Sequence, residues 1–136
     1  MKNKKYNLQI TKDQAERIML ALDLYTRLSV GQVDNLKDIS FEKEKGRFKQ
    51  PSEETLIKLQ SEMFPSLTGL HHSHGIHSQK LPDKIREAYD IYKVMMYEFN
   101  KGKGVMNVYA DKVRQTSKQK LPLFEKNERQ SVEEKE

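Results

Sequence analysis

Two stretches of the chain carry apolar residues at the spacing of an α-helix, and they constrain the fold more than any other feature. In the first, residues 12–30, the apolar positions are numerous enough to cover two sides of a helix. Thr11 and Gln14 have the spacing of a capping box at its start. The second begins at Pro82, which suits the first turn of a helix, and ends near Gly102. These two helices predict a helix-dominated core.

Shorter elements are expected between the two long helices. The sequence after Pro51-Ser52 predicts another helix, which Pro65 ends because proline cannot continue it. Residues 32–39 favour a second short helix. Residues 65–80 are rich in Ser and His and predict a long irregular loop, a kind of segment that often carries function.

Two segments alternate between apolar and polar residues, which is the period of a β-strand. They are residues 6–10, where Tyr6, Leu8 and Ile10 alternate with polar residues, and residues 105–109. Pairing of the two would bring the chain ends together. The predicted fold class is therefore α+β, a helix-dominated single domain over residues 1–124 with two short strands. Residues 125–136 are polar and acidic and predict a disordered tail.

Composition excludes several classes of protein. The chain has no cysteine, which excludes a disulfide framework, thiolate zinc sites and thiol catalysis. No apolar run approaches the roughly 18 residues needed to span a bilayer, and the basic start is followed by a polar segment rather than an apolar one. We therefore expect no signal peptide and a cytoplasmic protein. The net charge of +5 favours phosphate-bearing partners, although a lysine-rich solvated surface accounts for it equally well.

No motif identifies a reaction, and the expected protein is not an enzyme. All four histidines lie between His71 and His77. Clustered imidazoles can bind zinc, nickel or copper. Here they lie on a loop, and no pair has the i,i+4 spacing that places two ligands on one face of a helix. We predict no metal site and no cofactor. The chain also lacks a phosphate-binding Gly-rich loop and a nucleophile elbow.

Three blocks of sequence do have a resemblance. They are residues 21–28 (Ala-Leu-Asp-Leu-Tyr-Thr-Arg-Leu) followed by Gly31-Gln32, residues 75–78 (Gly-Ile-His-Ser) and residues 88–94 (Ala-Tyr-Asp-Ile-Tyr-Lys-Val). In this order, and spread over most of residues 11–100, they resemble a group of small bacteriophage and prophage proteins with no established activity. The resemblance implies a phage origin and no mechanism.

The chain departs from that group at two places. Met95 and Met96 stand where group members tend to have Arg-His, and three histidines, His71, His72 and His74, lie outside the shared pattern. The second departure further weakens the case for a metal site in this loop.

Several polar residues in or after these blocks are not explained by core packing. Arginine, serine and threonine are good phosphate-binding residues, because a guanidinium offers a bidentate fork and hydroxyls add donors. The expected ligand-binding residues are Arg27, Gln32, His77, Ser78, Asp90, Arg114, Thr116 and Ser117. Two plainer interpretations stay open. Asp23 lies four residues before Arg27 and suits an ordinary surface ion pair, and residues 114–118 suit a solvated turn.

Function is expected among three classes. The first is a non-enzymatic phage accessory protein that counters host antiviral defence, most concretely by sequestering a nucleotide-derived immune signalling molecule. The second is a protein–protein inhibitor of a host enzyme, and the third is a nucleic-acid-binding accessory factor. Because the first long helix is apolar on two sides, we also expect a homo-oligomer, most simply a symmetric dimer.

Overall fold

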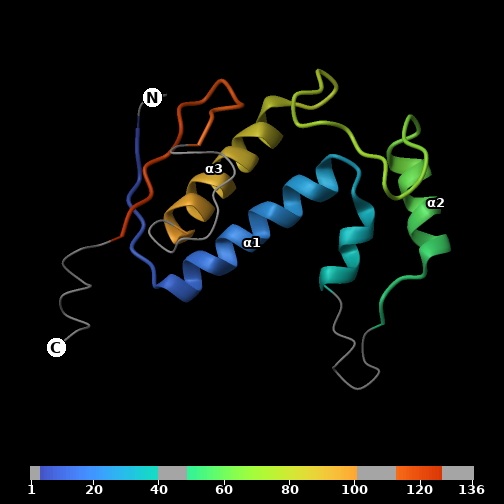
Figure 1. The fold of residues 1–136 in the computed structure, drawn as a ribbon, viewed down its shortest axis with the longest axis horizontal. Helices are drawn as coiled ribbons and strands as arrows, with labels where there is room; N and C mark the ends of the chain where they lie inside the picture. Colours follow the sequence, from blue (N-terminus) through green and yellow to red (C-terminus); the bar gives the residue numbers. More distant parts are fainter. Residues whose placement is uncertain (1–3, 40–48, 101–112, 127–136) are drawn as a thin grey trace.

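The computed structural model describes residues 4–39, 49–100 and 113–126. Helix α1 spans Lys12–Ser29, a 3-10 helix η1 spans Val33–Ile39, α2 spans Glu53–Met63 and α3 spans Asp83–Asn100 (Figure 1). Helices α1 and α3 pack side by side and run in opposite directions, while η1 turns away from the end of α1 and packs on α2. None of the described helices is both long and apolar enough to cross a membrane.

Local capping explains where the helices begin. The Thr11 side chain accepts a hydrogen bond from the Gln14 backbone N–H (3.1 Å), and the Gln14 side chain accepts one from the Thr11 N–H (2.9 Å), which confirms the predicted capping box. Ser52 caps α2 by accepting from the Thr55 N–H (3.1 Å). The second short helix appears as η1, with a 3-10 backbone. Residues 64–82 are irregular, as predicted.

The α+β fold class predicted from the sequence is wrong, because the described residues form helices and loops without a strand. Residues 6–10 are extended, but residues 4–10 make no hydrogen bond with any described residue. Apolar alternation predicts an extended backbone, whereas a strand also requires a partner for its N–H and C=O groups. The second predicted strand, residues 105–109, and most of the predicted tail lie outside the described residues.

The main core lies between α1 and α3. It contains Ala15 of α1 and Ile85, Ala88 and Met95 of α3, all buried. At one end, Val30, Leu81 and Ile85 form a buried cluster against which Ile76 packs. The irregular loop before α3 thus contributes apolar residues to the same core and is fixed where it meets α3.

A second set of contacts joins α2 to the end of α1. Buried Gln60 donates hydrogen bonds from Nε2 to the carbonyls of Gly31 (3.2 Å) and His72 (3.1 Å). Gly31 has a φ of 100°, a conformation that side chains disfavour, and a Cβ there would overlap the Cδ1 methyl of buried Leu67. The side-chain amide of Gln60 and the close packing of Leu67 on Gly31 therefore hold α2, the irregular loop and the end of α1 together.

Replacing Gly31 by alanine should destabilise the protein more than the same change at Gly69. Both glycines have a φ near 100°, so both variants carry the backbone cost of about 1–2 kcal/mol. A Cβ at Gly69 meets no atom within 4 Å, whereas one at Gly31 must displace Leu67, which adds about 1–3 kcal/mol. Urea denaturation of both variants measures the difference, and equal losses would show that Leu67 yields without cost.

Candidate functional site

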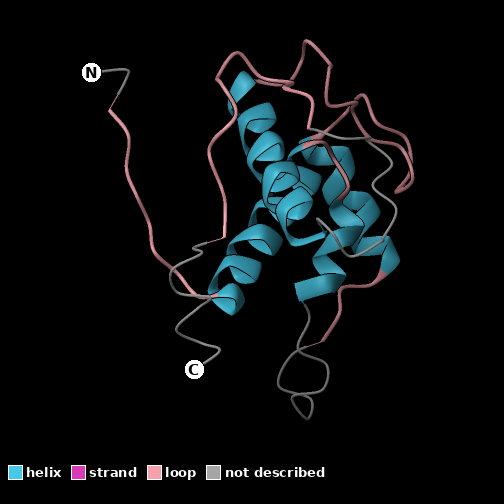
Figure 2. Ribbon diagram, turned by 60° about the vertical axis from the view of Figure 1, so that its left-hand side comes forward, coloured by secondary structure: helices cyan, strands magenta, loops and turns pink. Residues whose placement is uncertain are grey.

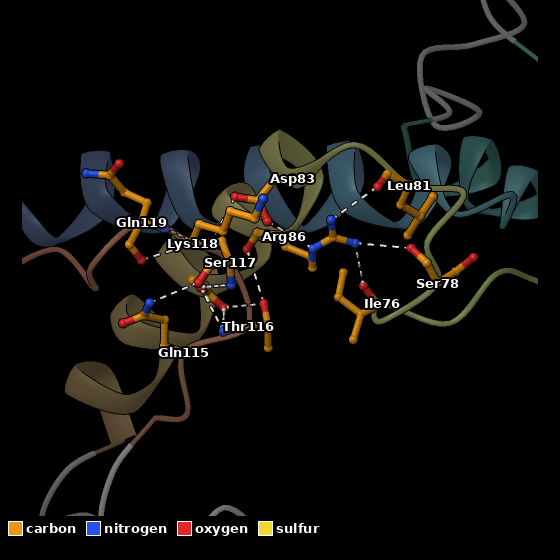
Figure 3. Close-up of polar contacts among 11 residues, drawn as sticks. Ile76, Ser78, Leu81, Asp83, Arg86, Gln115, Thr116, Ser117, Lys118 and Gln119 are labelled. Carbon is orange, nitrogen blue, oxygen red and sulfur yellow. Dashed lines mark hydrogen bonds and ion pairs between the residues drawn. The ribbon is translucent and has the colours of Figure 1, made fainter. Parts of the chain in front are cut away.

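Helix α3 has two different faces. Ile85, Ala88 and Met95 are buried on the side of α1. Asp83, Arg86 and Asp90, at spacings of three and four residues, share the other side of the helix. Figure 3 shows two irregular segments meeting this polar face, residues 76–81 from the loop before α3 and residues 115–119 from the chain after it.

Asp90 organises the second of these segments. Its carboxylate, only 2% exposed, accepts hydrogen bonds from the Thr116 N–H (3.0 Å to each oxygen), the Thr116 hydroxyl (2.6 Å) and the Ser117 N–H (3.0 Å). A buried carboxylate costs free energy unless such donors replace its water. The Ser117 hydroxyl in turn donates to the Gln119 carbonyl (3.2 Å). The turn at residues 116–117 is therefore fixed by one side chain of α3.

Arg86 holds the first segment, residues 76–81, by donating hydrogen bonds to its backbone. Its guanidinium donates to the carbonyls of Ser78 (3.1 Å), Leu81 (3.2 Å) and Ile76 (3.4 Å), and its Nε pairs with Asp83 at 3.1 Å. These bonds satisfy three loop carbonyls that have no helix or sheet partner.

Asp83 links the two segments. It accepts the Lys118 backbone N–H (3.0 Å) with one oxygen while the other pairs with Arg86. The Lys118 hydrogen bond lowers the pKa of Asp83 below its ordinary value; desolvation opposes it, and the hydrogen bond and charge of Arg86 lower the pKa further. Both segments are thus anchored to one side of α3. The anchoring residues span the helix from Asp83 to Asp90, a length of about 10 Å along its axis.

The anchored segments and the first turn of α3 present basic side chains to solvent. We call this group the basic surface: Lys80, Lys84, Arg114, Lys118 and Lys120, all exposed. None of them makes an ion pair with another described residue. With Arg86, these side chains bring six positive charges, against three negative charges on Asp83, Glu87 and Asp90 of the same part of α3. The surface therefore favours anions.

The structure separates Arg27 and Gln32 from the other predicted site residues. Arg27 pairs with Asp23 (3.0 Å) and also donates to Gln32 Oε1 (3.2 Å), and its side chain is 45% exposed. Asp23 and Arg27 lie near Tyr92, whose pKa is raised by burial and then by the charge of Asp23. Because Tyr92 is two residues from Asp90, it points to the opposite side of α3. Arg27 is satisfied within the chain, as the surface ion pair interpretation anticipates.

The remaining predicted residues come together on the polar side of α3. Ser78, Asp90, Thr116 and Ser117 belong to the anchoring network, while His77 and Arg114 are exposed on the same two segments. The backbone N–H and hydroxyl of Thr116 are engaged by Asp90, so these groups act as scaffold in this structure.

Sequence reasoning missed three residues of this network, Asp83, Arg86 and Lys118. The spacing of Asp83, Arg86 and Asp90, which places them on one side of the predicted helix, was a readable signal for the first two. Lys118 contributes through its backbone N–H, and no side-chain pattern reveals such a contact.

Two of the four histidines of the loop, His72 and His74, are held by separate local contacts. His72 Nδ1 accepts from the Thr68 N–H (3.1 Å), and the His74 ring lies 6.2 Å from that of Phe64. The His74 backbone N–H donates to the Val30 carbonyl (2.8 Å). Among the described residues, no three side chains of His, Cys, Asp or Glu gather as a metal site.

Replacing Asp90 by asparagine should destabilise the protein by about 2–3 kcal/mol, because the amide brings a donor to a site filled with donors and removes the charge that strengthens them. Glu87→Gln is the matched control on the same helix, with an expected change within about 0.5 kcal/mol. Urea denaturation followed by far-UV circular dichroism measures both. Equal losses in the two variants would contradict the scaffold role of Asp90.

The Lys118 amide should report the titration of Asp83. The pKa of the Asp83 carboxyl group is lowered in the folded protein. The contribution of Asp83 to stability is therefore present above the ordinary pKa of 3.8 and is lost as the pH falls through the lower pKa of the folded protein. We expect the Lys118 amide proton shift, followed by NMR from about pH 5 to about pH 2, to change with a midpoint below 3.8. Asp83→Asn should abolish this transition, and a midpoint at or above 3.8 would contradict the contact.

Comparison with protein-family models, with curated proteins and with solved structures finds no match. The contacts of α3 with its two irregular segments, and the side chains that those segments expose, are therefore the features from which a function follows.

Proposed function

We propose that this chain is a non-enzymatic phage accessory protein that counters host antiviral defence by binding and sequestering a nucleotide-derived immune signalling molecule in the bacterial cytoplasm. The sequence blocks that resemble phage proteins support the setting. The single observation that carries the ligand class is the basic surface: five exposed cations on the first turn of α3 and on or beside the two segments that Asp83, Arg86 and Asp90 hold in place. Phosphate groups are the anions that such a surface suits best.

The anchoring of the basic surface supports binding rather than catalysis. Cations on fixed backbone lose less conformational freedom on binding than cations on free loops, which improves affinity. The carboxylate of Asp90 is 2% exposed and accepts hydrogen bonds from two backbone N–H groups as well as from the Thr116 hydroxyl, so its oxygens hold the fold and do not face solvent. Arg114 offers a bidentate fork to one phosphate, and lysines of the basic surface supply charge to a second.

One observation favours the alternative of a protein–protein inhibitor. Helix α1 leaves Ile18, Leu20 and Tyr25 exposed, and exposed apolar side chains on a helix suit a protein partner. The basic surface also suits nucleic acid, the third class. Salt dependence separates this class from a small ligand, because a protein that contacts many phosphates along a nucleic acid loses affinity steeply as salt rises.

The deciding experiment is native mass spectrometry of the full chain recovered from phage-infected cells. A sequestered nucleotide appears as a defined mass increment released on denaturation, a host enzyme as a stoichiometric complex, and nucleic acid as a heterogeneous load. The first outcome supports the proposal, and either of the others replaces it.

Alanine at Arg114 or Lys118 should weaken nucleotide binding at least tenfold, about 1.4 kcal/mol. Arg27→Ala should have little effect, because Asp23 and Gln32 already pair with Arg27 on the opposite side of α3. Arg17→Ala, an exposed arginine on α1, is the control for general loss of charge. Isothermal titration with a panel of nucleoside di- and triphosphates and cyclic dinucleotides measures the four variants. Equal weakening by all of them would show that net charge, and not the basic surface, controls binding.

A further inference from the structure

Residues 4–11 form an extended segment that stands away from the helices (Figure 2). Tyr6 is 91% exposed and Leu8 is 71% exposed, although burial of such large apolar side chains is favourable. Residues 4–10 also make no hydrogen bond with any described residue. The backbone of residues 4–10 and the side chains of Tyr6 and Leu8 are therefore free to contact another molecule, and Ile10 is partly exposed.

The order of residues in this segment is that of a strand with one apolar side. Tyr6, Leu8 and Ile10 lie on one side of an extended backbone, and the residues between them are polar. An extended backbone with unpaired N–H and C=O groups is a template for pairing with another strand. The segment has the features of a β-strand but lacks its partner within the described chain.

We propose that this partner is the same segment of a second copy of the chain, paired antiparallel about a two-fold axis at Leu8. In this register Leu8 lies opposite Leu8 of the second copy, and Tyr6 lies opposite Ile10. The polar side matches equally, with Asn7 opposite Gln9. The segment is thus complementary to itself, which is the property that a symmetric dimer interface requires.

Other pairings of the two copies are less favourable. A parallel pairing in register sets Lys4 and Lys5 beside their own copies, and like charges directly opposite each other are destabilising. An antiparallel pairing centred on Asn7 sets Lys4 opposite Ile10. A shift by one residue places apolar side chains opposite polar ones along the whole segment. Among these antiparallel registers, only the one centred on Leu8 matches all three apolar positions.

Helix α1 supplies the cover that the paired segments need. A two-stranded ribbon is only marginally stable by itself, and a stable interface buries on the order of 1,200 Å² or more. The segment leads directly into α1 at Lys12, so pairing brings α1 of both copies to the interface. Ile18 and Tyr25, which share one side of α1, are exposed in the single chain and add apolar area there.

Single cysteines test the register, because the chain has none of its own. Leu8→Cys should form a covalent dimer under mild oxidation, since opposite residues of an antiparallel pair lie about 4.5–5.5 Å apart at Cα, within disulfide range. Tyr6→Cys should not, because the two Tyr6 positions are separated by about 13 Å along the ribbon. A mixture of Asn7→Cys and Gln9→Cys chains should cross-link to each other. Equal cross-linking of Leu8→Cys and Tyr6→Cys, or none by Leu8→Cys, would overturn the register.

Sedimentation velocity tests the dimer itself. The full chain should sediment as a dimer, and Leu8→Lys should raise the dimer dissociation constant at least tenfold while the far-UV spectrum stays unchanged. Asn7→Lys, on the polar side, is the matched control and should stay dimeric. A monomeric full chain at high concentration, or a Leu8→Lys dimer as tight as that of the control, would overturn the proposal.

Discussion

Backbone N–H groups in the segment after α3 have no helix or sheet to bond with, and the carboxylate of Asp90 accepts two of them. The irregular parts of this structure depend on that kind of contact. Arg86 does the reverse for the preceding loop, donating to three of its carbonyls. In a fold whose described part has no sheet, charged side chains of one helix take the place of neighbouring strands as partners for irregular backbone.

Because α3 is apolar on one side and charged on the other, it joins the core to the surface that we propose as functional. The apolar side fixes α3 against α1, and the charged side fixes the backbone that carries the exposed cations. Asp83 and Asp90 bond to the backbone of the segment after α3, while the more numerous cations around them project to solvent.

The parts of the fold that could be predicted from the sequence are those with local causes. The capping box at Thr11, the cap at Ser52 and the helical periodicities each act within a few residues, and the structure places α1, α2 and α3 accordingly. The strand at residues 6–10 was mispredicted because pairing depends on a partner that local sequence does not specify. Asp90 was selected as a polar residue unexplained by packing, but its bond to Thr116, 26 residues away, requires the folded chain.

The bridging amide of Gln60 has a consequence for how the chain opens. Helix α2 packs on η1 and not on α1 or α3, so it is tied to the antiparallel pair through η1, Gln60 and the residues around Gly31. Cooperative units of a protein separate where few contacts join them. Helix α2 can therefore open while α1 and α3 stay packed, which gives the chain two levels of protection against amide hydrogen exchange. The basic surface belongs to the more protected part of the chain. The loop that contains the four histidines, His71 to His77, lies at the boundary between the more and the less protected parts.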